Sequence, residues 1–345
     1  VALPAVYGTG SPKGNNAEMK TDGWELSLSW RDSFKLGGKP FDYSIKAMVW
    51  DSKSVITKYV NDTGSLGTVK GFIENGGSPS SYYVGMTVGE IWGYTVAGLF
   101  RDQADIDSSA IHDFVQASDK VTRPGQVKIA DLDGNGFIDP GNFAVDDHGD
   151  LRIIGNQSPR YRYGVNLSAR WNGIGLSVFL QGVGARDWYP GSDAGMFWGK
   201  YGRPFFALIP SIHNYTDDMY SAERNNWDTA YWPRMTTYQS NSSYSWTKLL
   251  EIPNTRYKQN AAYLRVKNIQ VDYTFPKALC QKIRLGGLKI YLSGENLFTL
   301  TPLHKYAPNF DPEALGYDTD FSSTAGDGYT YPVLKSVTLG VNITF

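Results

Sequence analysis

Several features that define common protein classes are scarce or missing in this chain of 345 residues. The single cysteine, Cys280, excludes a framework of internal disulfides. No run of about 18 apolar residues occurs, so no transmembrane helix is predicted. Charged residues make up only 19% of the chain, the net charge is −1, and no block of Lys and Arg stands out. This balance gives no electrostatic case for binding nucleic acid or an anionic membrane surface.

Signatures of catalysis are also missing. The chain contains no phosphate-binding P-loop, no nucleophile elbow and no His-Glu-x-x-His motif. Its four histidines are scattered without the spacing of metal ligands: His112, His148, His213 and His304. Carboxylates are plentiful, but a sequence cannot show two of them at the separation that a glycosidase needs. We therefore expect a protein that is not an enzyme.

Glycine and aromatic residues are abundant (Gly 37, Tyr 23, Phe 16, Trp 10), and apolar and polar side chains alternate strictly in several segments. In residues 333–345 the odd positions are Val, Lys, Val, Leu, Val, Ile and Phe, and the even positions after Leu334 are Ser, Thr, Gly, Asn and Thr. Because successive side chains of a strand point to opposite faces, this pattern predicts a strand with one apolar and one polar face. Its length approaches the roughly 9–11 residues that a tilted strand needs to cross a bilayer. This ending is typical of the last strand of an outer-membrane barrel.

Seven segments carry the same alternation: 23–31, 41–50, 160–171, 174–184, 262–275, 285–296 and 333–345. Short turns follow the first, third and fifth of them, and the turn at Asn172-Gly173 is a good hairpin signal. Long segments fill 51–159, 185–261 and 297–332. Transmembrane barrels have short periplasmic turns and long extracellular loops, whereas a soluble sandwich has no reason to alternate them. The sequence therefore predicts an all-β fold, an antiparallel transmembrane β-barrel with three long extracellular loops.

Seven strands cannot close a barrel. Single-chain bacterial barrels have an even number of strands, at least eight, and an open lipid-facing edge is not tolerated. The sequence also starts without Met or a signal peptide. We therefore expect residues 1–345 to be the carboxy-terminal part of a larger barrel, whose other strands come from a preceding portion.

One motif has the spacing of a cation site. Residues 131–139 match the first nine positions of an EF-hand-type calcium loop, in which oxygen ligands surround one point and a glycine at the sixth position makes the turn. The candidate ligands are Asp131, Asp133, Asn135, the carbonyl of Phe137 and Asp139. The twelfth position is Asn142 instead of a bidentate Glu, so that a later acid (Asp146, Asp147 or Asp150) would have to complete the shell. The alternative is a solvated Asp/Gly/Asn turn without an ion.

The segment 185–261 combines many aromatic rings with polar side chains. Its aromatic residues are Trp188, Tyr189, Phe197, Trp198, Tyr201, Trp227, Tyr231, Trp232, Tyr238, Tyr244 and Trp246. Rings beside polar groups suit the binding of sugars or peptides, but large loops also use aromatics to pack on themselves. We expect most of these rings to pack or to contact a partner, and a few to face a ligand. No residue is assigned to substrate binding.

A series of motifs in order along nearly the whole chain resembles one family. They are Asn16-Ala17-Glu18-Met19-Lys20 with Gly23-Trp24-Glu25-Leu26; Ile91-Trp92-Gly93-Tyr94 with Gly98-Leu99-Phe100; Gly125-Gln126-Val127-Lys128 with residues 131–139; Ile154-Gly155-Asn156 with Pro159; Tyr263-Leu264-Arg265-Val266-Lys267-Asn268-Ile269 with Pro276; Gly294-Glu295-Asn296-Leu297-Phe298-Thr299; and Asn309-Phe310-Asp311-Pro312-Glu313. Together they resemble the carboxy-terminal third of SusC-like TonB-dependent transporters of the Bacteroidota outer membrane. In that alignment Asp150 is the later acid, after an insertion that the family often lacks.

The resemblance implies a 22-stranded barrel in the bacterial outer membrane, of which this chain supplies about seven strands. It also implies a plug and a TonB-binding region that lie outside this chain, and a SusD-like surface lipoprotein as partner. Nutrient import of oligosaccharides or oligopeptides would then be driven through the TonB complex. The sequence leaves the cargo open between glycan and peptide. The alternative to transport is a soluble or cell-surface β-rich glycan-binding module.

Overall fold

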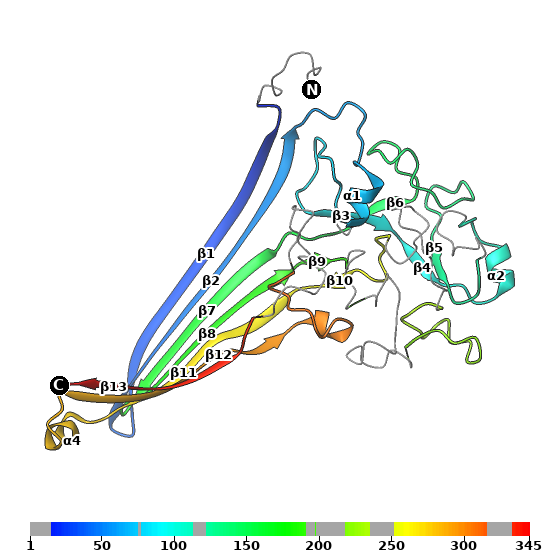
Figure 1. The fold of residues 1–345 in the computed structure, drawn as a ribbon. Helices are drawn as coiled ribbons and strands as arrows, with labels where there is room; N and C mark the ends of the chain where they lie inside the picture. The colour runs from blue at the N-terminus through cyan, green and yellow to red at the C-terminus, as the bar shows by residue number, and fades with distance from the viewer. Residues whose placement is uncertain are drawn as a thin grey trace, which may run out of the picture.

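The protein is dominated by one antiparallel sheet of seven long strands (Figure 1). A computed structural model describes residues 15–74, 77–112, 122–190, 197, 218–234, 252–315 and 333–345. The strands are β1 (Glu18–Leu36), β2 (Lys39–Lys58), β7 (Arg160–Trp171), β8 (Ile174–Ala185), β11 (Tyr263–Thr274), β12 (Gly287–Leu300) and β13 (Ser336–Thr344). In the sheet they follow this same order, so each strand pairs with the long strand before it in the chain. The prediction of an all-β antiparallel fold is confirmed.

Each of the seven predicted segments is a strand, and β7 has the predicted bounds. The first two strands are much longer than predicted, with 19 residues in β1 and 20 in β2. A bilayer crossing needs only about 9–11 residues, so both strands continue beyond the apolar band. Their outer parts were missed because the backbone ladder continues where the alternation of side chains stops. The long segment predicted to begin at residue 51 therefore begins after Lys58.

The connections alternate in length as predicted. The β1–β2 hairpin turns at Gly37 and Gly38, and the β7–β8 hairpin turns at Asn172 and Gly173. All four residues have positive φ, which is the backbone of a type I′ turn and explains the need for glycine or asparagine. The helix α4 (Lys277–Lys282) fills the third short connection and buries Cys280. These turns lie together with the carboxy terminus at one end of the sheet, and the described parts of the long segments gather at the other end (Figure 1).

The described parts of the long segments fold into a body of their own at the far end of the sheet (Figure 1). Its elements are α1 (Val69–Glu74), β3 (Glu90–Tyr94), β4 (Val96–Leu99), α2 (Gln103–Asp107), β5 (Val127–Ile129), β6 (Leu151–Asn156), β9 (Asp187–Trp188), β10 (Gln259–Asn260) and the 3-10 turn η3 (Pro302–Lys305). β3 pairs with β6, β4 with β5 and β9 with β10. The main buried core lies here and includes Leu66, Tyr94, Leu151, Trp188, Trp232 and Tyr257. None of the helices in the described ranges is long and apolar enough to cross a membrane.

The register of the sheet sorts side chains into two faces. One row across all seven strands reads Trp30, Ile45, Leu167, Val178, Ile269, Gly294, Val337. The adjacent row, on the opposite face, reads Arg31, Ser44, Ser168, Ser177, Gln270, Ser293, Thr338. We call the first face the apolar face and the second the polar face. Apolar side chains on the apolar face are largely exposed, 61% for Trp30 and 73% for Leu339, so the described protein does not bury this face against a second layer.

An aromatic ring and a glycine form a cross-strand pair on the polar face. Gly340 of β13 lies opposite Tyr291 of β12, and a Cβ atom at Gly340 would collide with the tyrosine ring. Replacing Gly340 by Val should therefore overpack this position and destabilise the folded protein by about 1–3 kcal/mol. The measurement is the urea midpoint of the complete protein in detergent micelles.

The double variant Gly340→Val, Tyr291→Ala is the control, because it removes the ring that the valine would strike. Its midpoint should lie above the value expected from adding the two single effects. Strictly additive effects would show that the ring and the glycine do not act as a pair.

Candidate functional site

The predicted ion loop lies in the body, between β5 and β6. Gly134 and Gly136 have φ values of 77° and 83°, a backbone that favours glycine and folds the loop inward. The Asp131 carboxylate accepts hydrogen bonds from both of their N–H groups, at 2.6 Å and 2.9 Å. The bond from Gly136 is the main reason that the pKa of Asp131 lies below its ordinary value. Asp131 is therefore held ionised at the first position of the loop.

Asp150 holds the two ends of the loop together. It is fully buried, and its two carboxylate oxygens accept the N–H groups of Leu132 (2.6 Å) and Asp139 (3.0 Å). Burial raises the pKa of Asp150, and the negative charges of Asp133 and Asp131 add to this effect. A buried carboxyl beside two others would be stabilised by a cation, so the structure fits the assignment of Asp150 as the later acid.

The structure brings together three of the six predicted ligands. Asp131, Asp133 and Asp150 each offer a carboxylate oxygen, and these oxygens all lie within 4.8 Å of one another. Ca²⁺ binds oxygens at about 2.3–2.6 Å, so two oxygens bound to the same ion can be separated by about twice this distance. The spacing of the three carboxylate oxygens is therefore compatible with one shared ion. Asn135 links this group to Asp139, because its side-chain amide donates to both Asp133 (3.1 Å) and Asp139 (3.1 Å).

Further hydrogen bonds fix the shape of the loop around these acids. The N–H of Phe137 donates to the side chain of Asn135 at 2.7 Å, which holds the seventh position within the loop. Asn142 donates to the Asp147 carboxylate, so the side chain at the twelfth position is paired with another acid. Ile138 is buried and donates its N–H to the carbonyl of Ile111 at 2.9 Å, which anchors the loop in the body.

The polar face of the sheet carries a row of charges near the short turns. Asp272 lies between two cations, with Arg170 at 3.7 Å and Lys289 at 3.3 Å. Gly175, on the strand between Arg170 and Asp272, leaves room for this arrangement, because a Cβ atom there would lie 2.6 Å from an Asp272 oxygen. Asp272 is only 6% exposed although the face around it is open. The polar face therefore contains a charge cluster built from neighbouring strands.

Three of the sequence motifs converge at the loop end of β11 and β12. Arg265 is buried, and its guanidinium donates to Asp311 at 2.5 Å, to Glu313 and to Thr299 at 2.9 Å. Lys267 adds a second ion pair to Glu313 at 3.1 Å. Burial opposes ionisation of Asp311, but the hydrogen bonds from Arg265 and from backbone N–H groups hold its pKa below the ordinary value. The network ties the segment 302–315 to the sheet.

The sequence did not single out this network. A detectable signal existed, because Arg265 and Lys267 stand close together in a predicted strand and Asp311 and Glu313 stand together in a loop. The missing information was the register: β11 has a bulge between Val266 and Asn268, which changes the side on which each residue lies. A charged residue in such a strand can be assigned a partner only when the bulge is known.

The aromatic rings of segment 185–261 pack on one another where the structure describes them. Trp188, Tyr189, Phe197 and Trp232 are buried in the core of the body, and Trp227 and Tyr231 pack against it. Tyr231 stacks on Tyr306 with ring centroids 3.6 Å apart. This outcome confirms packing for these rings. Trp198, Tyr201, Tyr238, Tyr244 and Trp246 lie outside the described residues, as does His213.

Comparisons with known proteins agree with this architecture. No family model matches the chain. Two receptors of Formosa agariphila do: TonB-dependent receptor P3 is 25% identical over 353 residues, covering 99% of this chain, and TonB-dependent receptor P26 is 23% identical over 353 residues, covering 100%. The chain spans only 30% and 31% of the length of these relatives.

Solved structures show the same fold. The RagAB peptide importer in its closed-closed state matches with a TM-score of 0.60 and 19% identity, covering 100% of this chain and 32% of that chain. The open-open state matches with a TM-score of 0.57 and 17% identity, covering 100% and 31%.

An antiparallel sheet with one apolar and one polar face, and with long loops at one end, is the type of sheet found in membrane β-barrels. Within this class, sequence similarity over nearly the whole chain makes the protein a homologue of the TonB-dependent receptors, which confirms the resemblance seen in the motifs.

Arg265 should be essential for the position of segment 302–315. Its replacement by Ala would leave the Asp311 and Glu313 carboxylates without their buried cation, and breaking a buried ion pair costs about 3–5 kcal/mol. Hydrogen exchange should therefore become faster at the backbone amides of 302–315 and remain unchanged in the β7–β8 hairpin.

Lys267→Ala provides the matched control, because its side chain is 25% exposed and its loss removes only the outer ion pair. That variant should change exchange in 302–315 much less. Equal exchange in both variants would argue against a special role for Arg265.

Proposed function

We propose that this chain forms part of a TonB-dependent importer of the bacterial outer membrane, which takes up oligosaccharides or oligopeptides together with a SusD-like surface lipoprotein. The observation that carries the proposal is the exposed apolar face across all seven strands. Soluble monomers rarely expose contiguous apolar patches of more than a few hundred Å². A hydrocarbon environment explains this face, because lipid-facing strands are apolar on their outer side.

The two sides of the sheet then have separate tasks. The apolar face would contact lipid, and the polar face would line an enclosed lumen. Hydroxyl and amide groups such as Ser44, Ser168, Ser177 and Gln270 share one row there, which suits hydrogen bonding to glycan or peptide cargo. The edge strands β1 and β13 have one long partner each in this sheet. Further strands, the plug and the TonB-binding region would come from the rest of the transporter, because an open edge is not stable in lipid.

The alternative is a soluble or cell-surface glycan-binding module. That hypothesis would need the aromatic rings to form an open platform, but the described rings of segment 185–261 pack mainly in the core. It would also leave side chains such as Leu28 and Leu339 in water at 62% and 73% exposure. Both observations favour the transporter. The loop body would then be the surface that meets the lipoprotein.

The membrane assignment predicts a difference between neighbouring residues of β13. Leu339→Arg in the complete transporter should reduce the yield of assembled outer-membrane protein, because an arginine facing the middle of the bilayer costs about 2–4 kcal/mol. Leu167→Arg should have a similar effect. The measurement is the heat-resistant, folded fraction in isolated outer membranes.

Thr338→Arg is the matched control, because it introduces the same charge one residue away on the polar face. It should leave the assembled fraction close to that of the unmodified protein. Equal losses for both faces, or normal assembly of Leu339→Arg and Leu167→Arg, would contradict the membrane assignment.

We also propose that residues 131–150 bind Ca²⁺ through Asp131, Asp133, Asn135, Phe137, Asp139 and Asp150. The close approach of three carboxylate oxygens and the burial of Asp150 support this site. The ion would be structural, because it would neutralise acidic groups that otherwise repel one another within the loop body. Nothing in this arrangement requires a catalytic metal.

Addition of Ca²⁺ should slow hydrogen exchange at residues 131–150, and Asp133→Asn should weaken this effect while Asp62→Asn, outside the loop, should not.

The raised pKa of Asp150 gives the pH dependence. Without the ion, the Asp150 carboxyl binds a proton more tightly in the folded loop than in the unfolded chain. The stability of the folded loop therefore increases as pH falls toward 3.8. Binding of Ca²⁺ requires the carboxylate, so the affinity for Ca²⁺ should fall over the same pH range. Protection that does not respond to Ca²⁺ would favour the ion-free turn.

A further inference from the structure

The polar face of the sheet carries more basic than acidic side chains. Between the short turns and the loop end of β7, and apart from the Arg265 network, the register places these basic residues on it: Arg31, Lys35, Lys46, Arg162, Arg170 and Lys289. The acidic residues on the same stretch of this face are Glu25, Asp42, Asp272 and Glu295. Asp272 is already shared between Arg170 and Lys289. The face therefore has an excess of positive charge.

Three of these cations have no acidic partner in the described ranges. Arg31, Lys46 and Arg162 are exposed and lie on the neighbouring strands β1, β2 and β7. Lys46 lies opposite Asn166, midway along β7 between Arg162 and Arg170. Four residues of a strand span about 13 Å, so cations follow one another at such intervals from the loop end to the turn end. A row of this kind along a water-filled wall attracts anions and repels cations.

A small pocket lies at the loop end of this row. β7 pairs with β2 only as far as Arg162. Residues 85–88 then become the neighbours of β2, and the N–H of Val88 donates to the carbonyl of Ser54 at 2.9 Å. The hydroxyl of Ser158 also donates to the carbonyl of Val88 at 2.9 Å, which fixes the other side of the opening. The resulting pocket has a volume of about 190 Å³, and we call it the basic pocket.

The charged residues that line the basic pocket are all cations. They are Lys53, Arg160 and Arg162, and no acidic residue of the described chain lines the pocket. Arg160 is neutralised by the buried Asp51, whose carboxylate accepts its Nε–H at 2.6 Å. Lys53 and Arg162 have no such partner among the described residues. Hydroxyl and amide side chains in the same lining belong to Ser52, Ser54, Asn156 and Ser158. The pocket therefore suits a ligand that carries both an anionic group and hydroxyl groups.

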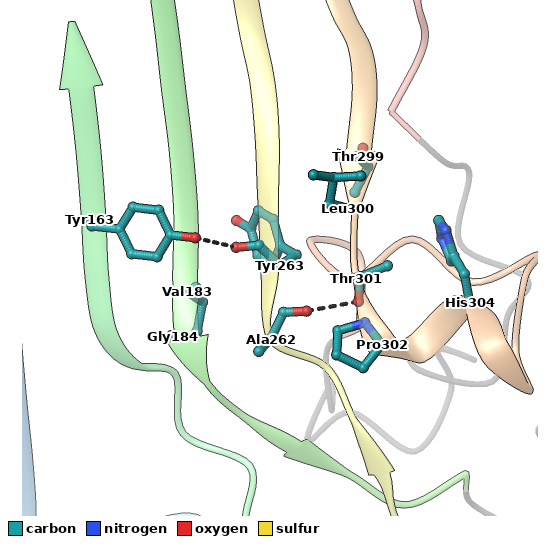
Figure 2. Close-up of a pocket in the computed structure, with 10 residues that line it drawn as sticks. All are labelled: Tyr163, Val183, Gly184, Ala262, Tyr263, Thr299, Leu300, Thr301, Pro302 and His304. Carbon is teal, nitrogen blue, oxygen red and sulfur yellow. Dashed lines mark hydrogen bonds between the residues drawn. The ribbon is translucent and has the colours of Figure 1, made fainter.

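A pocket on the apolar face at the same end of the sheet has a different lining. It lies beside Tyr163, whose hydroxyl donates to the carbonyl of Tyr263 at 3.0 Å, and it is bordered by the small residues Gly184 and Ala262 (Figure 2). Among the described residues that line it, none is Lys or Arg. The basic lining is therefore a property of the polar face and not of the loop end in general.

An aromatic residue accompanies the basic group on the polar face. Trp50 lies on this face directly opposite Arg162. An indole ring can stack on the apolar side of a sugar ring, and a guanidinium binds a carboxylate through two parallel hydrogen bonds. Hydroxyl and amide groups continue the same face toward the turns, in the row that contains Ser44, Ser168 and Gln270. This combination fits an acidic sugar better than a peptide, whose apolar side chains would need apolar pockets.

We propose that the cargo of this importer is an acidic oligosaccharide and that Arg162 binds its carboxylate groups. The inference rests on the proposed import function and names the class of substrate. Arg162 would be the first cation of the row that the cargo meets below the loop body. Lys46 and Arg31 would hold carboxylates further along the polar face. An extended chain of acidic sugars could therefore contact several cations at once.

The experiment measures binding to the complete transporter in detergent by isothermal titration calorimetry. The probes are the hexamers of galacturonate and of mannuronate, each compared with its neutral, carboxyl-reduced counterpart. At least one acidic hexamer should bind about tenfold more tightly than its counterpart, which corresponds to about 1.4 kcal/mol. Arg162→Gln should remove most of this preference and leave binding of the neutral hexamer unchanged. It should also reduce the dependence of binding on salt, because salt screens exposed charges.

Lys20→Gln is the matched control, because it removes an exposed cation at the loop end of β1 whose position belongs to the apolar face. It should bind every hexamer like the unmodified protein. Equal binding of acidic and neutral hexamers, or an unchanged preference in Arg162→Gln, would overturn the proposal. Tighter binding of hexaglutamate than of both acidic hexamers would overturn the assignment to a sugar. The import proposal would survive these results as long as the protein assembles in membranes and Leu339→Arg does not, so the two failures can be distinguished.

Discussion

The antiparallel backbone ladder is the constraint on which the rest of this protein depends. Each strand pairs with its chain neighbours in a fixed register, so that every second side chain lies on the same face across seven strands. A slip by one residue would move Leu167 and Leu339 to the polar face and Ser168 and Thr338 to the apolar face. The hydrophobic pattern and the hairpin turns therefore have to agree. They agree at Asn172-Gly173, where the turn joins β7 to β8 in the register that keeps the apolar side chains of both strands on one face.

The strands could be predicted because alternation is a local signal that survives without knowledge of the fold. It fails where the environment no longer differs between the two faces. β2 continues to Lys58 by pairing with β1, and its outer end also bonds to the body, where the N–H of Ile56 donates to the carbonyl of Met86 at 2.9 Å. Such contacts are set by backbone geometry and by residues far away in the sequence. No periodic pattern of side chains predicts these contacts.

The candidate sites show the same division. The acidic loop was visible in the sequence because its candidate ligands come from a short segment with fixed spacing, and only the distant candidate Asp150 rested on the family resemblance. The Arg265 network was not visible, because it combines residues from two strands and a loop. A bulge in β11 decides which side chains meet there. Sites that depend on register can be found only after the strands have been paired.

The sheet and the loop body also differ in how they are stabilised. The body has a buried aromatic core, so it can hold its shape in water through the hydrophobic effect. The sheet has no such core in the described residues, and its apolar face gains stability only when another apolar phase covers it. The ion pairs of Arg265 lie at the boundary between these two parts and join them. The position of the loop body therefore depends on the sheet to which these ion pairs join it.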